Sequence, residues 1–255
     1  MGELLGQLPR PEGYRLAWRR TDGRGPTVVW LGGFRSDMSG TKAQALADWA
    51  ARSRRAFLRF DYSGHGESGG DFAEGTIGRW RDDALAAVDK LAPGPLILVG
   101  SSMGGWIACL LALARPDRVQ GLVLIAPAAD FTEALMWPGL SDEARAAIEA
   151  DGFWMQPSEY GPPYPITRAM IEDGRRWSIL PGPVRITAPV RVLQGAQDPD
   201  VPWEHALKLA QALEAEDVVF TLVKAGDHRL STPADLQRLT AAVEELAAMA
   251  DRPSR

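Results

Sequence analysis

A serine near the middle of the chain has the flanking residues that nucleophilic catalysis requires. Residues 100–104 read Gly-Ser-Ser-Met-Gly, which matches the pattern G-x-S-x-G with Ser102 at its centre. The pattern lies directly after an apolar run typical of a buried strand and directly before a helical pattern, which is the context of a nucleophile elbow. The glycines are needed there because a Cβ at either position would crowd the tight turn or the neighbouring strand. We therefore predict that Ser102 is a nucleophile, and that the following helix N-terminus favours negative charge beside it.

A serine hydroxyl attacks a carbonyl effectively only when a base removes its proton. The chain contains three histidines. His228 lies between the last predicted strand and the last predicted helix, where the chain order serine, acid, histidine places the base. His65 lies in a glycine-rich loop after an early strand, where a structural turn role is expected, and His205 lies at the start of a helix, where a solvated or capping role is expected. The chain order therefore favours His228 as the base.

The base needs a carboxylate that fixes its tautomer and stabilises the imidazolium ion. Asp198 follows the next-to-last predicted strand, three residues past Gly195, and is the carboxylate that we predict. Asp200 is a close alternative by spacing alone, and Asp130, after an earlier strand, is a more distant one. Because a loop aspartate most often serves in an Asx turn or as a helix N-cap, spacing leaves these alternatives open.

The negative charge that develops on the attacked carbonyl oxygen needs backbone N–H donors. Met103, the residue after the nucleophile, supplies one donor in this pattern. Phe34 is the predicted second donor, because Gly32 and Gly33 before it let the backbone approach the site closely. Arg35 follows directly and is predicted to meet a polar or anionic leaving group.

Short apolar segments alternate with longer helical patterns over most of the chain. Several strand-like segments are apolar at consecutive positions, as a strand covered on both faces should be. The predicted strands are residues 14–20, 27–31, 56–61, 95–100, 121–125, 190–194 and 218–223. The predicted helices are residues 40–52, 76–91, 103–114, 204–213 and 233–250. This alternation predicts an α/β fold, with a mainly parallel twisted sheet, helices on both faces and an antiparallel edge at its first strands.

The alternation of strands and helices breaks over residues 131–187. A segment of this length inside a compact domain is usually functional, so we predict a helical lid over the carboxyl edge of the sheet. The predicted domains are therefore a core of residues 1–130 and 188–255 and a lid of residues 131–187. An apolar lid with Met136, Trp137, Phe153, Trp154 and Met155 would suit an acyl chain, and Trp137, Trp154 and Met155 are the substrate contacts that we predict.

The composition excludes several classes of protein. The chain has 255 residues, of which 24% are charged and 45% hydrophobic, and a net charge of −5, which is ordinary for a globular protein. The mild negative charge gives no electrostatic footprint for nucleic acid or for an anionic membrane. No apolar run is long enough to predict an integral membrane segment. The single cysteine, Cys109, excludes an internal disulfide and a multi-cysteine metal site, and we expect it to be a buried packing residue.

These motifs resemble the α/β-hydrolase superfamily over essentially the whole chain. The motifs of the nucleophile, the acid and the histidine occur in the order that this superfamily requires, as GSSMGG, GAQDPDVP and GDH. The insertion of residues 131–187 lies where that fold carries its lid. More narrowly, the chain resembles the branch of mitochondrial palmitoyl-protein thioesterases and acyl-glucuronide esterases. The segments that carry this resemblance are WLGGFRSDMSGTKA, RFDYSGHGESGG, GRWRDD, VGSSMGGW and residues 154–160. The resemblance implies that Ser102, Asp198 and His228 form a triad that hydrolyses S-acyl thioesters and acyl esters without a metal or cofactor.

The predicted function is hydrolysis of acyl thioesters through an acyl-enzyme, as in an S-depalmitoylase. The predicted partner is an acyl thioester or ester, with an S-acylated protein as one source. A general carboxylesterase for small or aryl esters, acyl glucuronides included, is the alternative. A non-catalytic binding protein ranks lower, because all three residue types of the triad are present in order. The N-terminus has neither a signal peptide nor a transit peptide pattern, so we expect a bacterial relative with a cytoplasmic location.

Overall fold

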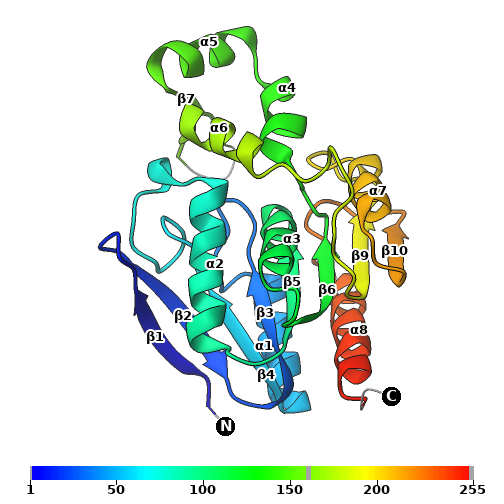
Figure 1. Ribbon diagram of the computed structural model, residues 1–255. Helices are drawn as coiled ribbons and strands as arrows, with labels where there is room; N and C mark the ends of the chain where they lie inside the picture. The colour runs from blue at the N-terminus through cyan, green and yellow to red at the C-terminus, as the bar shows by residue number, and fades with distance from the viewer. Residues whose placement is uncertain (1, 159–161, 253–255) are drawn as a thin grey trace.

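The computed structural model describes residues 2–158 and 162–252. Outside this description lie residue 1, residues 159–161, which include the last two residues of the motif at 154–160, and residues 253–255. An eight-stranded sheet has the order β1-β2-β4-β3-β5-β6-β9-β10 (Figure 1). Its strands are β1 (Leu4–Pro9), β2 (Arg15–Thr21), β3 (Arg24–Leu31), β4 (Arg55–Phe60), β5 (Leu96–Ser101), β6 (Val119–Ile125), β9 (Val190–Gly195) and β10 (Val218–Val223).

The sheet is mainly parallel, as predicted from the alternation of elements. β2 pairs antiparallel with both β1 and β4, whereas the other neighbours pair in parallel. The predicted strands and helices of the core agree with the observed ones to within three residues at each end. β1 was not predicted, because this edge strand exposes Leu4 and Leu5 and has no continuous apolar face.

Helices cover both faces of the sheet, which explains why its strands are apolar at consecutive positions. In β3, Val28 and Trp30 belong to the apolar layer that α1 and α8 cover. Val29 and Leu31 belong to the opposite layer, with α2, α3 and α7. A strand turns successive side chains to opposite faces, so both layers are filled in turn. The helices of the two layers are α1 (Thr41–Ser53), α2 (Ile77–Leu91), α3 (Met103–Ala114), α7 (Trp203–Ala212) and α8 (Pro233–Ala250).

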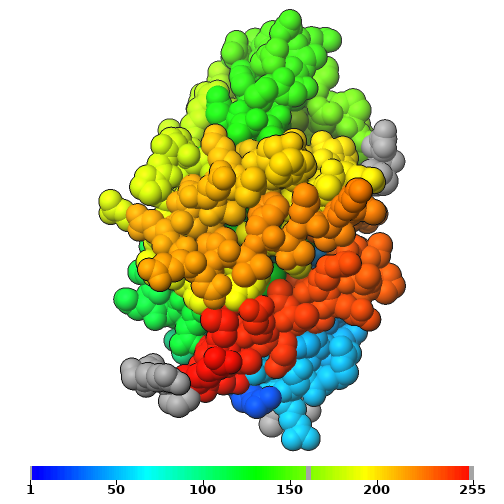
Figure 2. Space-filling view, turned by 90° about the vertical axis from the view of Figure 1, so that its right-hand side faces the viewer, coloured from blue at the N-terminus to red at the C-terminus, as the bar shows by residue number. Residues whose placement is uncertain are grey.

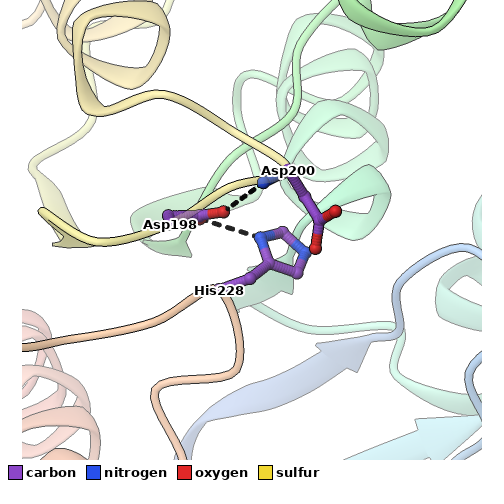
Figure 3. A group of neighbouring side chains, drawn as sticks. All are labelled: Asp198, Asp200 and His228. Atoms are coloured by element: carbon purple, nitrogen blue, oxygen red, sulfur yellow. Dashed lines mark hydrogen bonds and ion pairs between the residues drawn. The ribbon is translucent and has the colours of Figure 1, made fainter. Parts of the chain in front are cut away.

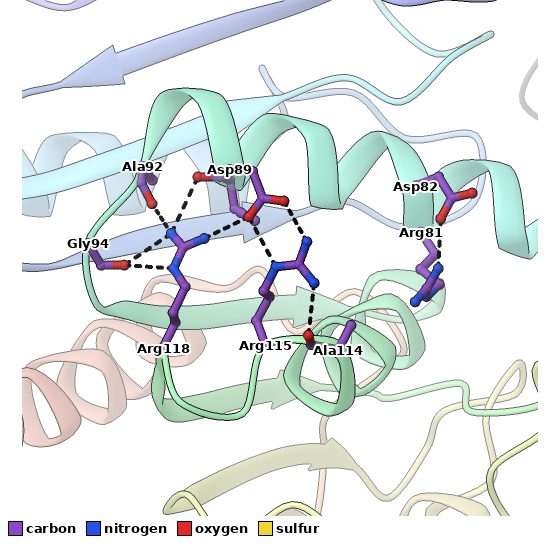
Figure 4. Close-up of polar contacts among 9 residues, drawn as sticks. Arg81, Asp82, Asp89, Ala92, Gly94, Ala114, Arg115 and Arg118 are labelled. Atoms are coloured by element: carbon purple, nitrogen blue, oxygen red, sulfur yellow. Dashed lines mark hydrogen bonds and ion pairs between the residues drawn. The ribbon is translucent and has the colours of Figure 1, made fainter.

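A polar network joins the C-terminal ends of α2 and α3 (Figure 4). Asp89 on α2 accepts hydrogen bonds from Arg115 Nη2 at 2.6 Å and from Arg118 Nη1 at 2.8 Å. Arg118 also donates to the carbonyl of Ala92, at the C-cap of α2. Because the last carbonyls of a helix have no partner within it, this contact satisfies a group that would otherwise need water. The network fixes α3 against α2 at the end opposite to Ser102.

Residues 131–187, which we name the cap, leave the sheet after β6 and return to it at β9. The cap lies above the ends of β5 and β6 in Figure 1, and Figure 2 shows it as one end of the molecule, above α7, β10 and α8. The predicted lid is helical, whereas the observed cap also contains a two-stranded antiparallel sheet, β7-β8. Its elements are η2 (Thr132–Met136), α4 (Trp137–Gly139), α5 (Asp142–Asp151), β7 (Phe153–Gln156), β8 (Tyr164–Thr167) and α6 (Arg168–Arg176).

Hydrogen bonds at the base of the cap connect its two ends to the core. The buried carboxylate of Asp130 accepts from the N–H groups of Ile179 and Leu180 at 2.9 Å, and from the Ser178 hydroxyl at 2.6 Å. Asp173 on α6 accepts from a backbone N–H in the first turn of α2 at 2.6 Å. Apolar side chains of the cap belong to the same buried layer as α2 and α3. No helix in the described part of the chain is long and apolar enough to cross a membrane.

Candidate active site

Ser102 lies at the sharp turn between β5 and α3. Its backbone has φ 55° and ψ −120°, which a non-glycine residue rarely adopts. A Cβ at Gly100 would lie 2.2 Å from the carbonyl oxygen of Gly104, and a Cβ at Gly104 would lie 2.0 Å from that of Leu31. The two glycines therefore permit the turn and the close packing of α3 on β3, for the steric reason predicted from the sequence.

His228 connects Ser102 to Asp198 through its two ring nitrogens. Its Nε2 lies 3.1 Å from Ser102 Oγ, and its Nδ1 lies 2.8 Å from Asp198 Oδ2. A carboxylate accepts hydrogen bonds, so Nδ1 carries the proton and Nε2 presents its lone pair to the serine hydroxyl. The loops after β9 and β10 carry Asp198 and His228, respectively. The fold thus brings together three residues that are far apart in the sequence.

Asp198 is a buried carboxylate that accepts four hydrogen bonds. Its Oδ1 accepts from the N–H groups of Asp200 and Val201, both at 2.9 Å. Its Oδ2 accepts from His228 and, at 3.1 Å, from Gln194 Nε2. Burial by itself raises the pKa of Asp198, but the hydrogen bonds from His228, Val201 and Asp200 outweigh it and hold the pKa below its usual value. Asp198 is therefore ionised at neutral pH and held toward His228.

Gln194 is a residue of the site that the sequence analysis did not identify. It is fully buried in β9, and its Nε2 also donates to the carbonyls of Gly195 and Val201. A glutamine inside an otherwise apolar strand is a usable signal, because a buried amide needs hydrogen-bond partners. Asp198 lies four residues further along the chain, so this glutamine is a signal that favours Asp198 as its hydrogen-bond partner.

Asp198 and Asp200 flank the ring of His228 from different sides (Figure 3). Asp200 is exposed and lines the cavity beside Ser102. Within residues 2–158 and 162–252, these three side chains form the one group able to hold a metal ion, with ligand atoms within 4.8 Å of one another. However, His228 Nδ1 and Asp198 Oδ2 already form a hydrogen bond with each other. The three side chains are therefore arranged as a hydrogen-bonded pair beside a third carboxylate, and not as ligands around a cation. The geometry favours Asp198 over Asp200 as the partner of His228.

The other candidates from the sequence lie elsewhere. Asp130 is engaged at the base of the cap. His65 is buried and contacts the loop after β3, and His205 Nε2 donates to the Ala129 carbonyl at 2.7 Å. Cys109 is fully buried, and burial raises the pKa of its thiol to about 12, so the thiol stays protonated.

The loop after β3 lies against the turn that carries Ser102. A Cβ at Gly33 would lie 3.3 Å from the carbonyl oxygen of Ser101 and 3.4 Å from Ser102 Cβ. Phe34 and Met103, the predicted N–H donors, both line the cavity into which Ser102 opens. The two predicted donors thus lie on the two segments that adjoin Ser102.

A cavity of about 680 Å³ lies over Ser102, between the core and the cap. Small-molecule sites commonly have volumes of roughly 300–1,000 Å³. The apolar side chains that line it from the cap include Phe131, Leu135, Met136, Leu140 and Ile166. The polar side chains that line it include Arg35, Gln156, Ser158 and Asp200. One wall therefore suits an acyl chain, whereas the polar part suits a leaving group.

The predicted substrate contacts divide between the cavity and the rest of the cap. Arg35 lines the cavity, and its guanidinium lies 3.9 Å from the centroid of the Tyr164 ring. Trp137, Trp154 and Met155 are not among the described residues that line it. Met155 is 43% exposed on β7, where the next residue, Gln156, faces the cavity instead. The alternation of β7, absent from the sequence prediction, turns Met155 away from the cavity. Trp137 and Trp154 pack instead against the buried apolar layer of the core.

The fold and the site define a hydrolase of the α/β class, with a serine at a strand-to-helix turn and the acid and histidine on later loops. A family model described as serine aminopeptidase, S33, matches residues 26–150. Mitochondrial palmitoyl-protein thioesterase ABHD10 of Mus musculus is 39% identical over 244 residues, which cover 95% of this chain and 82% of that protein.

Solved structures agree with the sequence comparison. The crystal structure of a putative hydrolase from Agrobacterium vitis S4 matches this chain with a TM-score of 0.92 and 45% sequence identity. The match covers 97% of this chain and 100% of that chain. Mouse α/β hydrolase domain-containing protein 10 has a TM-score of 0.88 and 39% identity, and covers 96% of this chain and 99% of that chain. The chain belongs to the α/β-hydrolase family, in the branch that contains ABHD10.

Proposed function

We propose that this protein is a serine hydrolase that cleaves acyl thioesters and esters through a covalent acyl-enzyme. The observation that carries the proposal is the line of contacts from Ser102 Oγ through His228 to the buried carboxylate of Asp198, beside the cavity. A carboxylate on Nδ1 stabilises the imidazolium ion that forms when Nε2 takes a proton. We assign Ser102 as the nucleophile, His228 as the general base and Asp198 as its orienting acid.

In the first step, Ser102 Oγ attacks the acyl carbonyl carbon while its proton passes to His228 Nε2. The carbonyl oxygen gains negative charge, and the N–H groups of Met103 and Phe34 donate to it. Met103 is the first residue of α3, so the positive end of the helix dipole favours the same charge. Asp198 stays ionised throughout and does not take the proton.

In the second step, the bond from the carbonyl carbon to sulfur or oxygen breaks, and His228 returns its proton to the leaving group. Water then attacks the acyl group on Ser102 while His228 removes a proton from the water. Collapse of this second intermediate releases the carboxylic acid, and the proton returns to Ser102 Oγ. A thiolate leaves with little help, so proton donation by His228 matters more for oxygen esters.

The substrate that we propose is a long-chain acyl thioester, as for an S-depalmitoylase. Support comes from the 39% identical mouse relative, which is named a palmitoyl-protein thioesterase. The apolar wall that the cap gives to the cavity fits such a chain. Each methylene buried there contributes about 0.8 kcal/mol, so kcat/KM should rise with chain length until the wall is filled. The cytoplasmic location stays a prediction, since that relative is named as mitochondrial.

The test is hydrolysis of acyl thioesters from acetyl to palmitoyl and of matched oxygen esters. We expect kcat/KM on thioesters to rise by roughly tenfold for each pair of methylenes that enters the cavity. Ser102→Ala should lower kcat by about 10³-fold or more. A fluorophosphonate probe should label the wild type and leave Ser102→Ala unlabelled.

The outcomes separate the candidate functions. Activity restricted to short or aryl esters would retain the triad and make the protein a general carboxylesterase, which the polar side chains Arg35, Gln156 and Asp200 at the cavity favour. Equal hydrolysis by the wild type and Ser102→Ala would refute the catalytic assignment itself.

A further inference from the structure

His65 lies in the loop after β4, where it contacts the segment that carries Phe34. Its side chain is 4% exposed. The backbone N–H of Arg35 donates to His65 Nε2 at 3.1 Å, and His65 Nδ1 lies 3.1 Å from the Ser63 carbonyl oxygen. Because an N–H donates and a carbonyl accepts, these two partners require a neutral ring with its proton on Nδ1. Two backbone groups thus specify both the charge and the tautomer of His65.

The segment that His65 contacts, residues 32–38, is strained and held at two points. Arg35 has φ 57°, in the left-handed region that favours glycine. Phe34 precedes it, and its ring packs against those of Phe72 and Phe131 at centroid distances of 5.1 and 5.8 Å. Further along, the N–H of Met38 donates to the buried carboxylate of Asp61 at 2.6 Å. Two buried side chains that accept hydrogen bonds from its N–H groups therefore hold the backbone of this segment.

We propose that His65 is a positioning residue for hydrolysis, which holds the Phe34 N–H toward the oxyanion by accepting from the Arg35 N–H. The proposal rests on the proposed function, since it takes Phe34 as an oxyanion donor. The two N–H groups belong to peptide planes that meet at the Cα of Phe34. Fixing one plane restricts the rotation of the other. The segment approaches Ser102 closely at Gly33, where a Cβ would lie 3.4 Å from Ser102 Cβ. His65 acts through the backbone and does not touch the substrate.

Protonation of His65 would turn a ring N–H against the N–H of Arg35, and the contact would be lost. Burial lowers the pKa of His65, while the Ser63 carbonyl raises it by a smaller amount, so the ring is neutral at pH 7. Burial also raises the pKa of Asp61 to about 6. His65 lies among residues 32–38, 61–83 and 164–167. The other ionisable side chains of these segments are Arg35, Asp37, Tyr62, Glu67, Asp71, Glu74, Arg79, Arg81, Asp82, Asp83 and Tyr164.

Two substitutions distinguish the loss of the hydrogen-bond acceptor at His65 from the loss of the volume that its ring fills. His65→Gln supplies an amide oxygen near the place of Nε2 and cannot be protonated, whereas His65→Leu fills similar space without an acceptor. We expect His65→Leu to lower kcat by about tenfold to a hundredfold with KM changed by less than about threefold, because a displaced oxyanion donor weakens binding of the transition state. His65→Gln should retain kcat within about threefold of the wild type at neutral pH.

The acid limb of the pH profile is the measurement that a purely structural role would not move. Log kcat/KM of the wild type should fall more steeply with acidification than that of His65→Gln, by about one unit of slope, because the wild type takes up one more proton at the site. Asp61 is the same in both proteins, so the difference belongs to His65.

Equal slopes for the wild type and His65→Gln would overturn the proposal. So would a folded His65→Leu whose kcat stays within about twofold of the wild type. If the leucine variant does not fold, the profile of the glutamine variant decides alone. The proposed function fails differently, since a wild type that fluorophosphonate does not label at Ser102 would refute it whatever the His65 variants do.

Discussion

Asp198 and Asp200 are two positions apart and have opposite surroundings. Asp198 turns its carboxylate back into its own loop, as in an Asx turn, and accepts from the backbone of Asp200 and Val201. The remaining oxygen is then free for Gln194 and His228. Asp200 contributes its backbone N–H to this turn and lines the cavity. The turn, and not the spacing, distinguishes the two carboxylates.

Asparagine at each position tests this distinction. Asp198→Asn should lower kcat by about 10³–10⁴-fold, because an amide neither fixes the Nδ1 tautomer of His228 nor stabilises the imidazolium ion. Asp200→Asn is the matched control and should change kcat by less than about tenfold, as expected for an exposed charge. The measurements are kcat and the thermal midpoint of each variant. Similar losses of kcat in the two variants would contradict the assignment of Asp198.

Four elements bring the site together because parallel strands end at the same edge of a sheet. The loops after β3, β5, β9 and β10 carry Phe34, Ser102, Asp198 and His228. This edge is where ligands bind in open α/β sheets. The sequence predicts these elements well, since strands buried on both faces are apolar runs, and the glycines around Ser102 are dictated by local sterics.

Other parts of the site depend on contacts that no local pattern encodes. Trp137, Trp154 and Met155 are apolar, yet the register of the β7-β8 hairpin and the docking of the cap turn other side chains to the cavity. His65 is one histidine in a glycine-rich loop, and its partner Arg35 lies 30 positions away. Such pairings arise only when the sheet places distant loops side by side.

The hydrogen bonds of Asp130 to residues 178–180 join the cap to the core, and removing them should weaken this connection. Asp130→Ala removes the acceptor of three donors, two of them backbone N–H groups, and should cost about 1–3 kcal/mol of stability. Asp130→Asn keeps an acceptor and tolerates the observed φ of 57°, so it should lose less. Hydrogen exchange should show faster exchange at residues 178–180 in the alanine variant. Unchanged exchange there would contradict a fastening role for Asp130.

Buried ionisable groups control the stability of the whole molecule against pH. Burial lowers the pKa values of His65 and His205, so below pH 6.5 the unfolded chain binds protons that the folded chain does not. Their effect is a loss of stability as the pH falls through that value. Asp61 acts in the opposite sense, because its pKa is raised from 3.8 to about 6 and the folded chain binds the proton first. Its contribution is lost as the pH rises across that interval.

His205→Gln isolates one of these contributions away from the catalytic residues. The amide can still donate to the Ala129 carbonyl, which His205 Nε2 contacts at 2.7 Å, but it does not take up a proton. The free energy of unfolding at pH 7 should stay within about 1 kcal/mol of the wild type. Between pH 7 and pH 5, the wild type should lose more stability than the variant in denaturant titrations. Parallel curves would show that His205 does not titrate between these states.

Asp130, the residue before the cap, is hydrogen-bonded to residues 178–180 near the end of the cap, so the two ends of the insertion are fastened at one joint. The residues assigned to bond making and bond breaking lie outside the cap, whereas the apolar wall of the cavity comes from within it. A lineage can therefore exchange or lengthen this single insertion and acquire new acyl groups while it inherits the same reaction. Substrate range and reaction chemistry can therefore evolve separately in this architecture. Replacing the cap with that of a relative, at the same joint, would transfer the relative's substrate range and leave the reaction chemistry unchanged.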